Sequence, residues 1–275
     1  MGVQKDQHSD TPPQAPYPQL VLFGDSLFQG CSDIQDGFSF QGALQNHCMR
    51  RIDVVNRGFS GYNTSQSLKI IENVFPAPTP SGPKLEILVV LLGANDAALV
   101  MPELSQHVPL DEYKANLKTI ITHPNITAHK PKILLVTPPP LDEIKITQAD
   151  LEWGWPHATR QHAISASYSE AARQVAKEVE GTILIDLYSL IMEYAISKTP
   201  GWDASLPKLG TPECGQRGYL EKLLPDGLHL SGEAYQVLFK AIVPHVRPEF
   251  PNLDTEGYVY PDWRNAEWFE NNAKK

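Results

Sequence analysis

The sequence has little cysteine and no long apolar run, and both shortages limit the classes of protein to which it can belong. Its three cysteines, Cys31, Cys48 and Cys214, are scattered and odd in number, which excludes a disulfide framework and the paired spacing of a zinc site. We interpret them as small buried hydrophobic residues. No apolar run approaches the roughly 20 residues of a membrane span, so we expect no stable membrane anchor.

Basic residues are also in the minority. The chain carries 23 Lys and Arg against 32 Asp and Glu, a formal net charge of −9 at pH 7, which argues against nucleic acid or an anionic membrane as the main partner. Residues 1–18 are polar and proline-rich and lack the apolar core of a signal peptide. We therefore expect a flexible N-terminal tail over 1–18 and a cytoplasmic location.

Short apolar runs alternate with longer amphipathic segments, which is typical of a parallel sheet covered by helices on both faces. The apolar runs predict five strands: Gln19–Gly24, Ile52–Asn56, Glu86–Leu92, Lys132–Thr137 and Thr182–Asp186. Helical spacing predicts four helices: Asn63–Asn73, Leu110–Thr122, His162–Glu180 and Ser231–Val246. Ser231 is the predicted N-cap of the last helix.

Two long stretches, 138–161 and 198–218, lack clear periodicity. Loops of that length inside a compact domain are usually functional lids or disordered, and Trp153 and Trp155 favour an ordered lid for the first stretch. The aromatic-rich segment 251–275 is expected to dock on the domain or on the second subunit of a homodimer. The folded domain is therefore expected to span 19–250.

Gly24-Asp25-Ser26-Leu27 follows the first predicted strand directly. Ser26 should then lie at the carboxyl edge of the sheet, where ligands bind in open α/β folds. Leu27 is expected to start a helix, whose free N–H groups and positive dipole end suit a developing oxyanion. The alternative is that Asp25 and Ser26 simply cap this helix, and the motif alone does not decide between the two.

Asp226-Gly227-Leu228-His229 lies just ahead of the last predicted helix. Because the two residues are three positions apart on a turn, the Asp226 carboxylate can accept from one imidazole nitrogen of His229 and leave the other for a serine hydroxyl. An ordinary Asp-Gly turn with a surface histidine is the competing interpretation.

Asn95, within Gly93-Ala94-Asn95-Asp96, follows the most apolar strand, and its amide can donate to a tetrahedral oxyanion. A loop turn is the alternative. In the segment Asn56–Gly61 a glycine would contribute only its backbone N–H, and spacing does not decide between Gly61 and Gly58. Because one sheet edge can gather all four segments, together they predict a site for acyl transfer.

These segments resemble the sequence blocks of the GDSL, or SGNH, hydrolases. Within that family the chain is similar to fungal isoamyl acetate-hydrolysing esterases from about Leu20 to Arg264, except in 138–161 and 198–218. The resemblance implies a flavodoxin-like three-layer α/β/α sandwich with a five-stranded parallel sheet, the SGNH hydrolase domain spanning 19–250. The serine is not in the Gly-x-Ser-x-Gly elbow of α/β-hydrolases.

The resemblance also implies roles for particular residues. Ser26 would be the nucleophile, His229 the base and Asp226 the residue that orients it. The backbone N–H groups of Ser26 and Gly61 and the side-chain amide of Asn95 would form the oxyanion hole. No metal or other cofactor is implied. Four apolar residues flank these positions and either wall the substrate pocket or pack in the core: Leu27, Phe28, Val100 and Leu228.

We therefore expect an esterase that cleaves small carboxylic esters through an acyl-serine intermediate, with short-chain acetate esters of alcohols such as isoamyl acetate as substrates. A lysophospholipase, thioesterase or acyltransferase of the same family is the alternative, and a non-catalytic binding protein is a more distant one. The expected partner is a small-molecule ester, with no nucleic acid.

Overall fold

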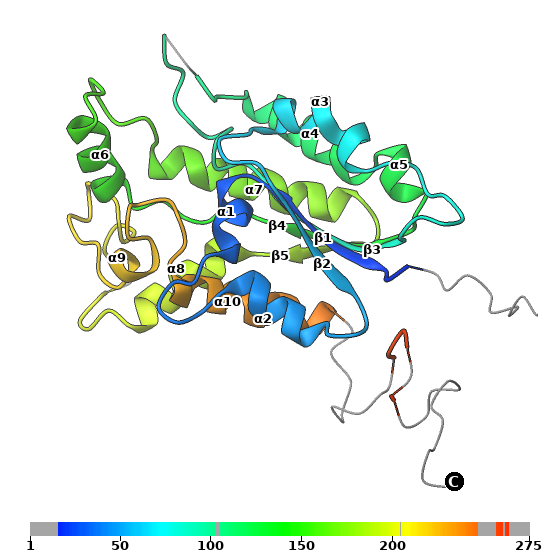
Figure 1. The fold of residues 1–275 in the computed structure, drawn as a ribbon. Coiled ribbons are helices and arrows are strands. Elements are labelled where there is room, and N and C mark those ends of the chain that lie inside the picture. The colour runs from blue at the N-terminus through cyan, green and yellow to red at the C-terminus, as the bar shows by residue number, and fades with distance from the viewer. Residues whose placement is uncertain (1–15, 103–104, 204, 247–256, 261, 264–275) are drawn as a thin grey trace, which may run out of the picture.

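A computed structural model describes residues 16–102, 105–203, 205–246, 257–260 and 262–263. Its centre is a sheet of five parallel strands in the order β2-β1-β3-β4-β5 (Figure 1). The strands are β1 Gln19–Gly24, β2 Asp53–Gly58, β3 Leu85–Leu91, β4 Lys132–Val136 and β5 Thr182–Ile185. This is the strand order of flavodoxin-like folds, so the predicted architecture is confirmed, with each strand within two residues of its predicted bounds.

Helices cover both faces of this sheet. The longer ones are α2 Phe40–His47, α3 Thr64–Val74, α4 Leu110–Ile121, α6 Glu143–Glu152, α7 His162–Glu178, α8 Leu187–Ser197 and α10 Gly232–Ile242. Short ones are α1 Ser26–Gln29, α5 Pro124–Thr127 and α9 Leu220–Leu223, with 3₁₀ turns at Gly30–Ser32 and Val243–His245. Helices α3, α4 and α7 pack on one face, and α2, α8 and α10 pack on the other (Figure 1).

The two halves of the core are built from alternating side chains of the central strands. Leu20 and Leu22 of β1 pack toward α2, α8 and α10, whereas Val21 and Phe23 pack toward α3, α4 and α7. Strand β3 alternates in the same way and is buried on both faces. This double burial explains why the run Ile87–Leu92 is continuously apolar in the sequence.

All four predicted helices form, with small shifts at their ends. Helix α3 begins at Thr64 because Asn63 caps it in a capping box with Gln66. Ser231 caps α10 as predicted, its hydroxyl accepting from the Ala234 N–H at 3.3 Å. Helix α1 begins one residue earlier than predicted, because the Asp25 carboxylate accepts from the Leu27 N–H and acts as its cap.

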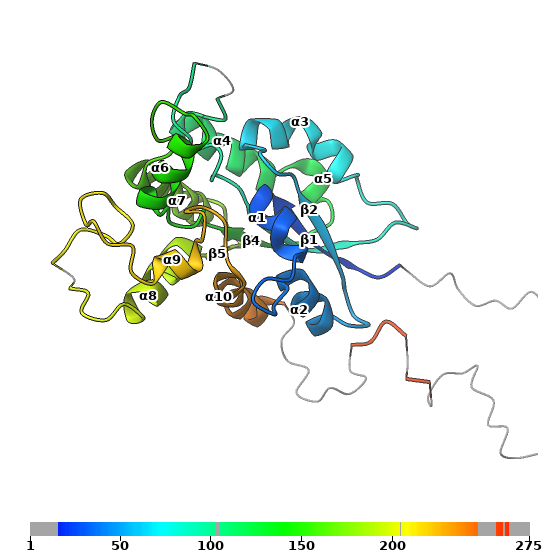
Figure 2. The same cartoon turned by 60° about the vertical axis from the view of Figure 1, so that its left-hand side comes forward.

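The stretch 138–161 contains a helix, α6, which its sequence pattern does not indicate. Helices α6 and α9 lie at the carboxyl end of the sheet in both views of the molecule (Figures 1 and 2). The stretch 198–218 is joined to the first by Arg217, which donates to the buried Asp142 carboxylate at 2.6 Å. The Trp-bearing stretch is thus ordered, and its function as a lid stays a prediction.

The predicted end segments lie largely outside the described residues, namely 1–15 and most of 251–275. In the described part of the tail, the Val259 N–H donates to the Arg50 carbonyl at 3.0 Å. The Tyr258 ring lies 4.1 Å from the Arg50 guanidinium, a cation–π distance. These contacts place the described tail residues beside the turn that precedes β2.

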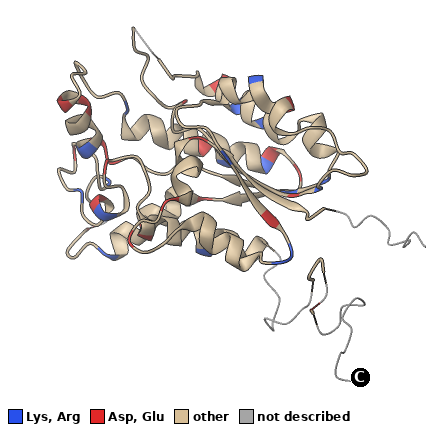
Figure 3. Cartoon of the chain, in the orientation of Figure 1, with Lys and Arg blue, Asp and Glu red and all other residues tan. Residues whose placement is uncertain are grey.

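The cysteines and the charged residues, whose numbers characterise the sequence, lie in different environments. Cys31 and Cys48 are buried in the core, as predicted, and burial raises the pKa of each thiol to about 12; Cys214 is partly exposed. Basic and acidic residues are interspersed along the helices (Figure 3). In the part of the chain that the structure describes, no helix combines the length and apolar character needed to cross a bilayer.

Candidate active site

Ser26, His229 and Asp226 form a hydrogen-bonded chain beyond the carboxyl end of β1. Ser26 Oγ lies 2.9 Å from His229 Nε2, although 203 positions separate the two residues in the sequence. His229 Nδ1 lies 2.6 Å from Asp226 Oδ2. Asp226 Oδ1 accepts from the backbone N–H groups of Leu228 at 2.9 Å and His229 at 2.8 Å. The carboxylate thus holds both the turn and the ring, and Nε2 is left to accept from the serine hydroxyl.

Electrostatics around His229 favour its protonated form. The hydrogen bond that the His229 ring donates to the Asp226 carboxylate raises the pKa of His229 above its ordinary value, against the opposite effect of burial. Burial alone would raise the pKa of Asp226, but hydrogen bonds from the His229 ring and from two backbone N–H groups lower it to about 2. Asp226 is therefore ionised wherever His229 titrates, and it can stabilise an imidazolium.

Close packing holds Ser26 against its neighbours. A Cβ on Gly24 would lie 2.3 Å from the Leu91 carbonyl oxygen, and one on Gly58 would lie 2.0 Å from the Gln29 nitrogen. Strand β1 therefore approaches β3, and strand β2 approaches α1, more closely than a side chain would permit. On the other side, the Tyr235 hydroxyl of α10 donates to the Leu27 carbonyl at 2.5 Å. The nucleophile candidate is thus fixed relative to β2, β3 and α10.

Asn95 lies in the loop after β3 and is only 4% exposed. Its Nδ2 donates one hydrogen to the Tyr62 carbonyl at 2.9 Å. Its Oδ1 accepts from Arg160 Nη2 at 3.1 Å. No described residue accepts the second amide hydrogen of Asn95, which leaves one donor for a ligand.

The two candidate glycines differ in what their N–H groups do. The Gly58 N–H is occupied, because it donates to Asn56 Oδ1 at 2.8 Å. Gly61 has φ +82°, and its N–H donates to no described residue. The geometry therefore favours Gly61 over Gly58 as a backbone donor.

The four apolar residues that flank the predicted site occupy different environments. Leu27 and Phe28 are fully buried in the core, where the Phe28 ring stacks on Phe40 at 6.3 Å between centroids. Leu228 is 8% exposed, whereas Val100 is 73% exposed. Core packing, rather than a pocket wall, accounts for Leu27 and Phe28.

Arg160 and Gln106 contact this region, and no sequence motif marks either of them. Arg160 is the second-to-last residue of the aperiodic stretch 138–161, and Gln106 lies in irregular chain ahead of α4. Arg160 Nη2 donates to Gln106 Oε1 at 3.0 Å as well as to Asn95. A single cation directly ahead of the α7 N-cap Gln161 is the only trace of this arrangement in the sequence.

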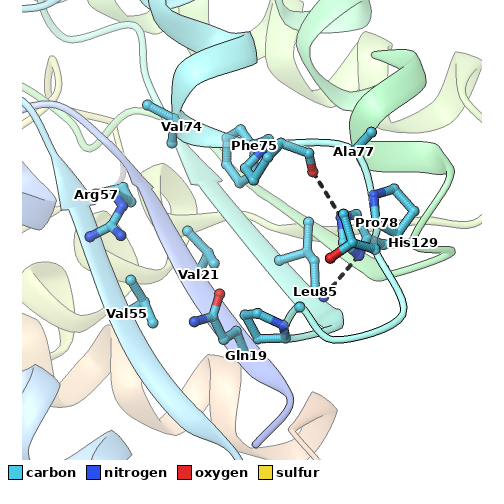
Figure 4. Close-up of a pocket in the computed structure, with 14 residues that line it drawn as sticks. Gln19, Val21, Val55, Arg57, Val74, Phe75, Ala77, Pro78, Leu85 and His129 are labelled. Carbon is cyan, nitrogen blue, oxygen red and sulfur yellow. Dashed lines mark hydrogen bonds between the residues drawn. The ribbon is translucent and has the colours of Figure 1, made fainter. Parts of the chain in front are cut away.

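One hollow lies beside Arg160 and Gln106, and a second lies away from the predicted site residues. One, of about 200 Å³, is lined by Met101, Trp153, Trp155 and Arg160 among others. The second, of about 330 Å³, lies between β1, β2 and the segment 74–85, and no predicted site residue lines it (Figure 4). Within the described ranges, no three His, Cys, Asp or Glu side chains are grouped so as to hold a metal ion.

Comparison with known proteins gives consistent matches over nearly the whole domain. Residues 22–237 match the model of the GDSL-like lipase/acylhydrolase family. A Bos taurus protein named isoamyl acetate-hydrolyzing esterase 1 homolog is 32% identical over 258 residues, 90% of this chain and 88% of its own. A GDSL esterase/lipase from Arabidopsis thaliana is 33% identical over 84% of this chain and 86% of its own. A solved acetyl xylan esterase shares the fold, with a TM-score of 0.58 and 18% identity, covering 83% of this chain and 99% of that one.

Proposed function

The chain belongs to the GDSL-like lipase/acylhydrolase family of esterases, and from this premise we propose that it hydrolyses small carboxylic esters through an acyl-Ser26 intermediate. The observation that carries the proposal is the 2.9 Å approach of Ser26 Oγ to His229 Nε2, with Asp226 behind the ring at 2.6 Å. A serine, a histidine and an orienting carboxylate in this order constitute an activated nucleophile.

In the proposed mechanism His229 moves the protons. Its Nε2 takes the proton of Ser26 as Oγ attacks the ester carbonyl carbon, and then delivers it to the leaving alcohol oxygen as the C–O bond breaks. A water attacks the acyl-Ser26 carbon and gives its proton to His229. Collapse of this second adduct releases the carboxylic acid and returns the proton to Ser26. The ionised Asp226 stabilises the imidazolium in both half-reactions.

Three donors are proposed to stabilise the oxyanion of each tetrahedral adduct. They are the Ser26 N–H at the start of α1, the Gly61 N–H and the second hydrogen of the Asn95 amide. The unoccupied N–H of Gly61 supports its choice over Gly58. Such donors contribute because they already point at the position where charge develops.

We further propose acetate and other short-chain esters of alcohols as substrates. The name of the Bos taurus relative supports this, since it refers to isoamyl acetate, and the chain covers 88% of that protein's length. The similar fold of an acetyl xylan esterase is compatible with a short acyl group but shows the fold alone.

Turnover of p-nitrophenyl esters from acetyl to dodecanoyl tests both parts of the proposal. We expect fast acetyl cleavage that falls with chain length and is absent in Ser26→Ala. Ser32→Ala is the matched control, because Ser32 is exposed and, among the described residues, its hydroxyl donates only to the Gln29 carbonyl at 3.4 Å. Retained turnover in Ser26→Ala would refute the nucleophile assignment.

The remaining outcomes separate the alternatives. A long-chain optimum would replace the acetate proposal with a lipid esterase or thioesterase. Ester formation on adding an alcohol would identify an acyltransferase. Absence of turnover at every length, together with no labelling of Ser26 by a serine-reactive phosphonate, would favour a non-catalytic binding protein.

A further inference from the structure

Arg160 is a partly buried cation at the end of the Trp-bearing stretch, and every hydrogen bond that it makes in the described structure ends on a group near the proposed oxyanion hole or on the adjacent Thr159. Its Nε donates to the Ala94 carbonyl at 3.2 Å, and its Nη2 donates to Asn95 Oδ1 at 3.1 Å. One guanidinium therefore holds both the backbone and the side chain of the loop that carries Asn95.

The chemistry of these contacts fixes the orientation of the Asn95 amide. A guanidinium can only donate, so the group of Asn95 that faces it must be the oxygen. The Tyr62 carbonyl can only accept, so the group that faces it must be the nitrogen, at 2.9 Å. Both partners therefore select the same amide flip, which presents Nδ2 rather than Oδ1 to the remaining open direction. The positively charged guanidinium that donates to Oδ1 also polarises the Asn95 amide and strengthens its free N–H as a donor.

Arg160 reaches the second donor through Gln106. Its Nη2 donates to Gln106 Oε1 at 3.0 Å, which turns Gln106 Nε2 toward the Gly61 carbonyl at 2.8 Å. The Gly61 peptide at φ +82° is thus held from its carbonyl side.

We propose that Arg160 is a positioning residue of the oxyanion hole, which orients Asn95 directly and Gly61 through Gln106. This inference rests on the proposed function, because it concerns the transition state of ester cleavage. The guanidinium is in turn held by the Trp-bearing stretch itself. Its Nη1 donates to Thr159 Oγ1 at 3.3 Å, and Thr159 donates to the buried Asp150 of α6 through its N–H and its hydroxyl, at 2.6 and 2.8 Å.

A double-mutant cycle between Arg160→Met and Asn95→Ala tests the proposal with p-nitrophenyl acetate. We expect Arg160→Met to lower kcat by about 10²-fold, with KM changed by less than about threefold, because the lost interaction acts in the transition state. In the Asn95→Ala background the same substitution should cost less than about tenfold, since one of its two targets is already gone. Equal losses in both backgrounds, or a loss in KM alone, would overturn the proposal.

Arg173→Met is the matched control, because Arg173 also makes several hydrogen bonds, to Asp186 and Glu170, and lies on α7 outside the site. Its effect on kcat should be small and equal in both backgrounds. If Arg160→Met does not fold, the same cycle is run with Arg160→Lys, whose single ammonium lacks the fork that reaches two acceptors. A wild-type protein that neither cleaves ester nor labels at Ser26 defeats the proposed function and this inference together. If the wild type cleaves ester and is labelled at Ser26, but Arg160→Met lowers kcat by the same factor in both backgrounds, only this inference is refuted.

Discussion

Asp226→Asn should nearly abolish turnover while leaving the fold intact. The two oxygens of Asp226 serve three donors, with Oδ1 on two backbone N–H groups and Oδ2 on His229 Nδ1. Asparagine has one oxygen, and keeping the turn places that oxygen on the backbone donors and its NH₂ group opposite Nδ1. The imidazole must then carry its proton on Nε2, which cannot accept from Ser26. We expect kcat to fall by about 10⁴, the loss typical of this tautomer exchange.

Two readouts distinguish this effect from simple unfolding. Circular dichroism and the thermal midpoint should stay close to those of the wild type, since the backbone hydrogen bonds persist. The pKa of His229 should fall in the variant, because the Asp226 carboxylate is the largest factor that raises it. Asp203→Asn is the control, since Asp203 accepts a backbone N–H, from Ser205 at 2.8 Å, in a loop away from the triad. A fall in kcat of less than about tenfold, with no change in the pKa of His229 as read from the pH dependence of kcat/KM, would refute the assigned role of Asp226.

Three further predictions concern the turn, the pH profile and Asp25. Gly227→Ala should lower both the thermal midpoint and kcat, because its Cβ would lie 2.8 Å from the Asp142 carbonyl oxygen and φ is +95°. Gly215→Ala is the control: φ is +66° and nothing lies within 4 Å of the added Cβ, so this variant has only the backbone strain of about 1–2 kcal/mol. In the wild type, kcat/KM should rise with pH through a midpoint above the ordinary histidine value of about 6.5, since the pKa of His229 is raised and the neutral ring is the base; a profile flat from pH 5 to 8 would exclude this. Burial raises the pKa of Asp25 from 3.8 to about 7. Between these two pH values the folded wild type therefore keeps a proton that the unfolded chain has lost. The free energy of unfolding of the wild type should then fall as pH rises from 3.8 to about 7. Asp25→Asn lacks this loss, and urea unfolding should show its relative stability improving by about 2–3 kcal/mol between pH 5 and 8; a constant difference would contradict the shift.

The strands could be predicted because their burial is written directly into local composition. Val89 and Val90 are both fully buried on opposite faces, so the run Ile87–Leu91 of β3 is apolar at every position. The helices at the carboxyl end were harder. Helix α6 has few apolar residues and includes β-branched Ile144, Ile146 and Thr147, which weaken its helical signal. Helix α8 is apolar on most sides, so it lacks a polar face that would reveal its period.

The candidate site divides in the same way. Ser26, Asn95 and the Asp226–His229 turn could be predicted because each directly follows a strand or precedes a helix. Gly61 and Gly58 could not be told apart from spacing, since the difference is whether Asn56 Oδ1 occupies the N–H. Arg160 and Gln106 could not be predicted, because their contacts depend on how two aperiodic segments fold back over the sheet.

The wide separation of Ser26 and His229 along the chain has a consequence for biosynthesis. The serine leaves the ribosome 203 residues ahead of His229, the base that lies 2.9 Å from it in the described structure, in the segment just before α10. Domains acquire structure from the N-terminal end during synthesis, so for most of that period the nucleophile is present without a partner to activate it. Docking of α10, with the Tyr235 hydroxyl on the Leu27 carbonyl, is the event that brings the two together. A nascent or C-terminally truncated chain would therefore be chemically silent toward esters, and turnover per molecule would count only chains that have been completed and folded to the end.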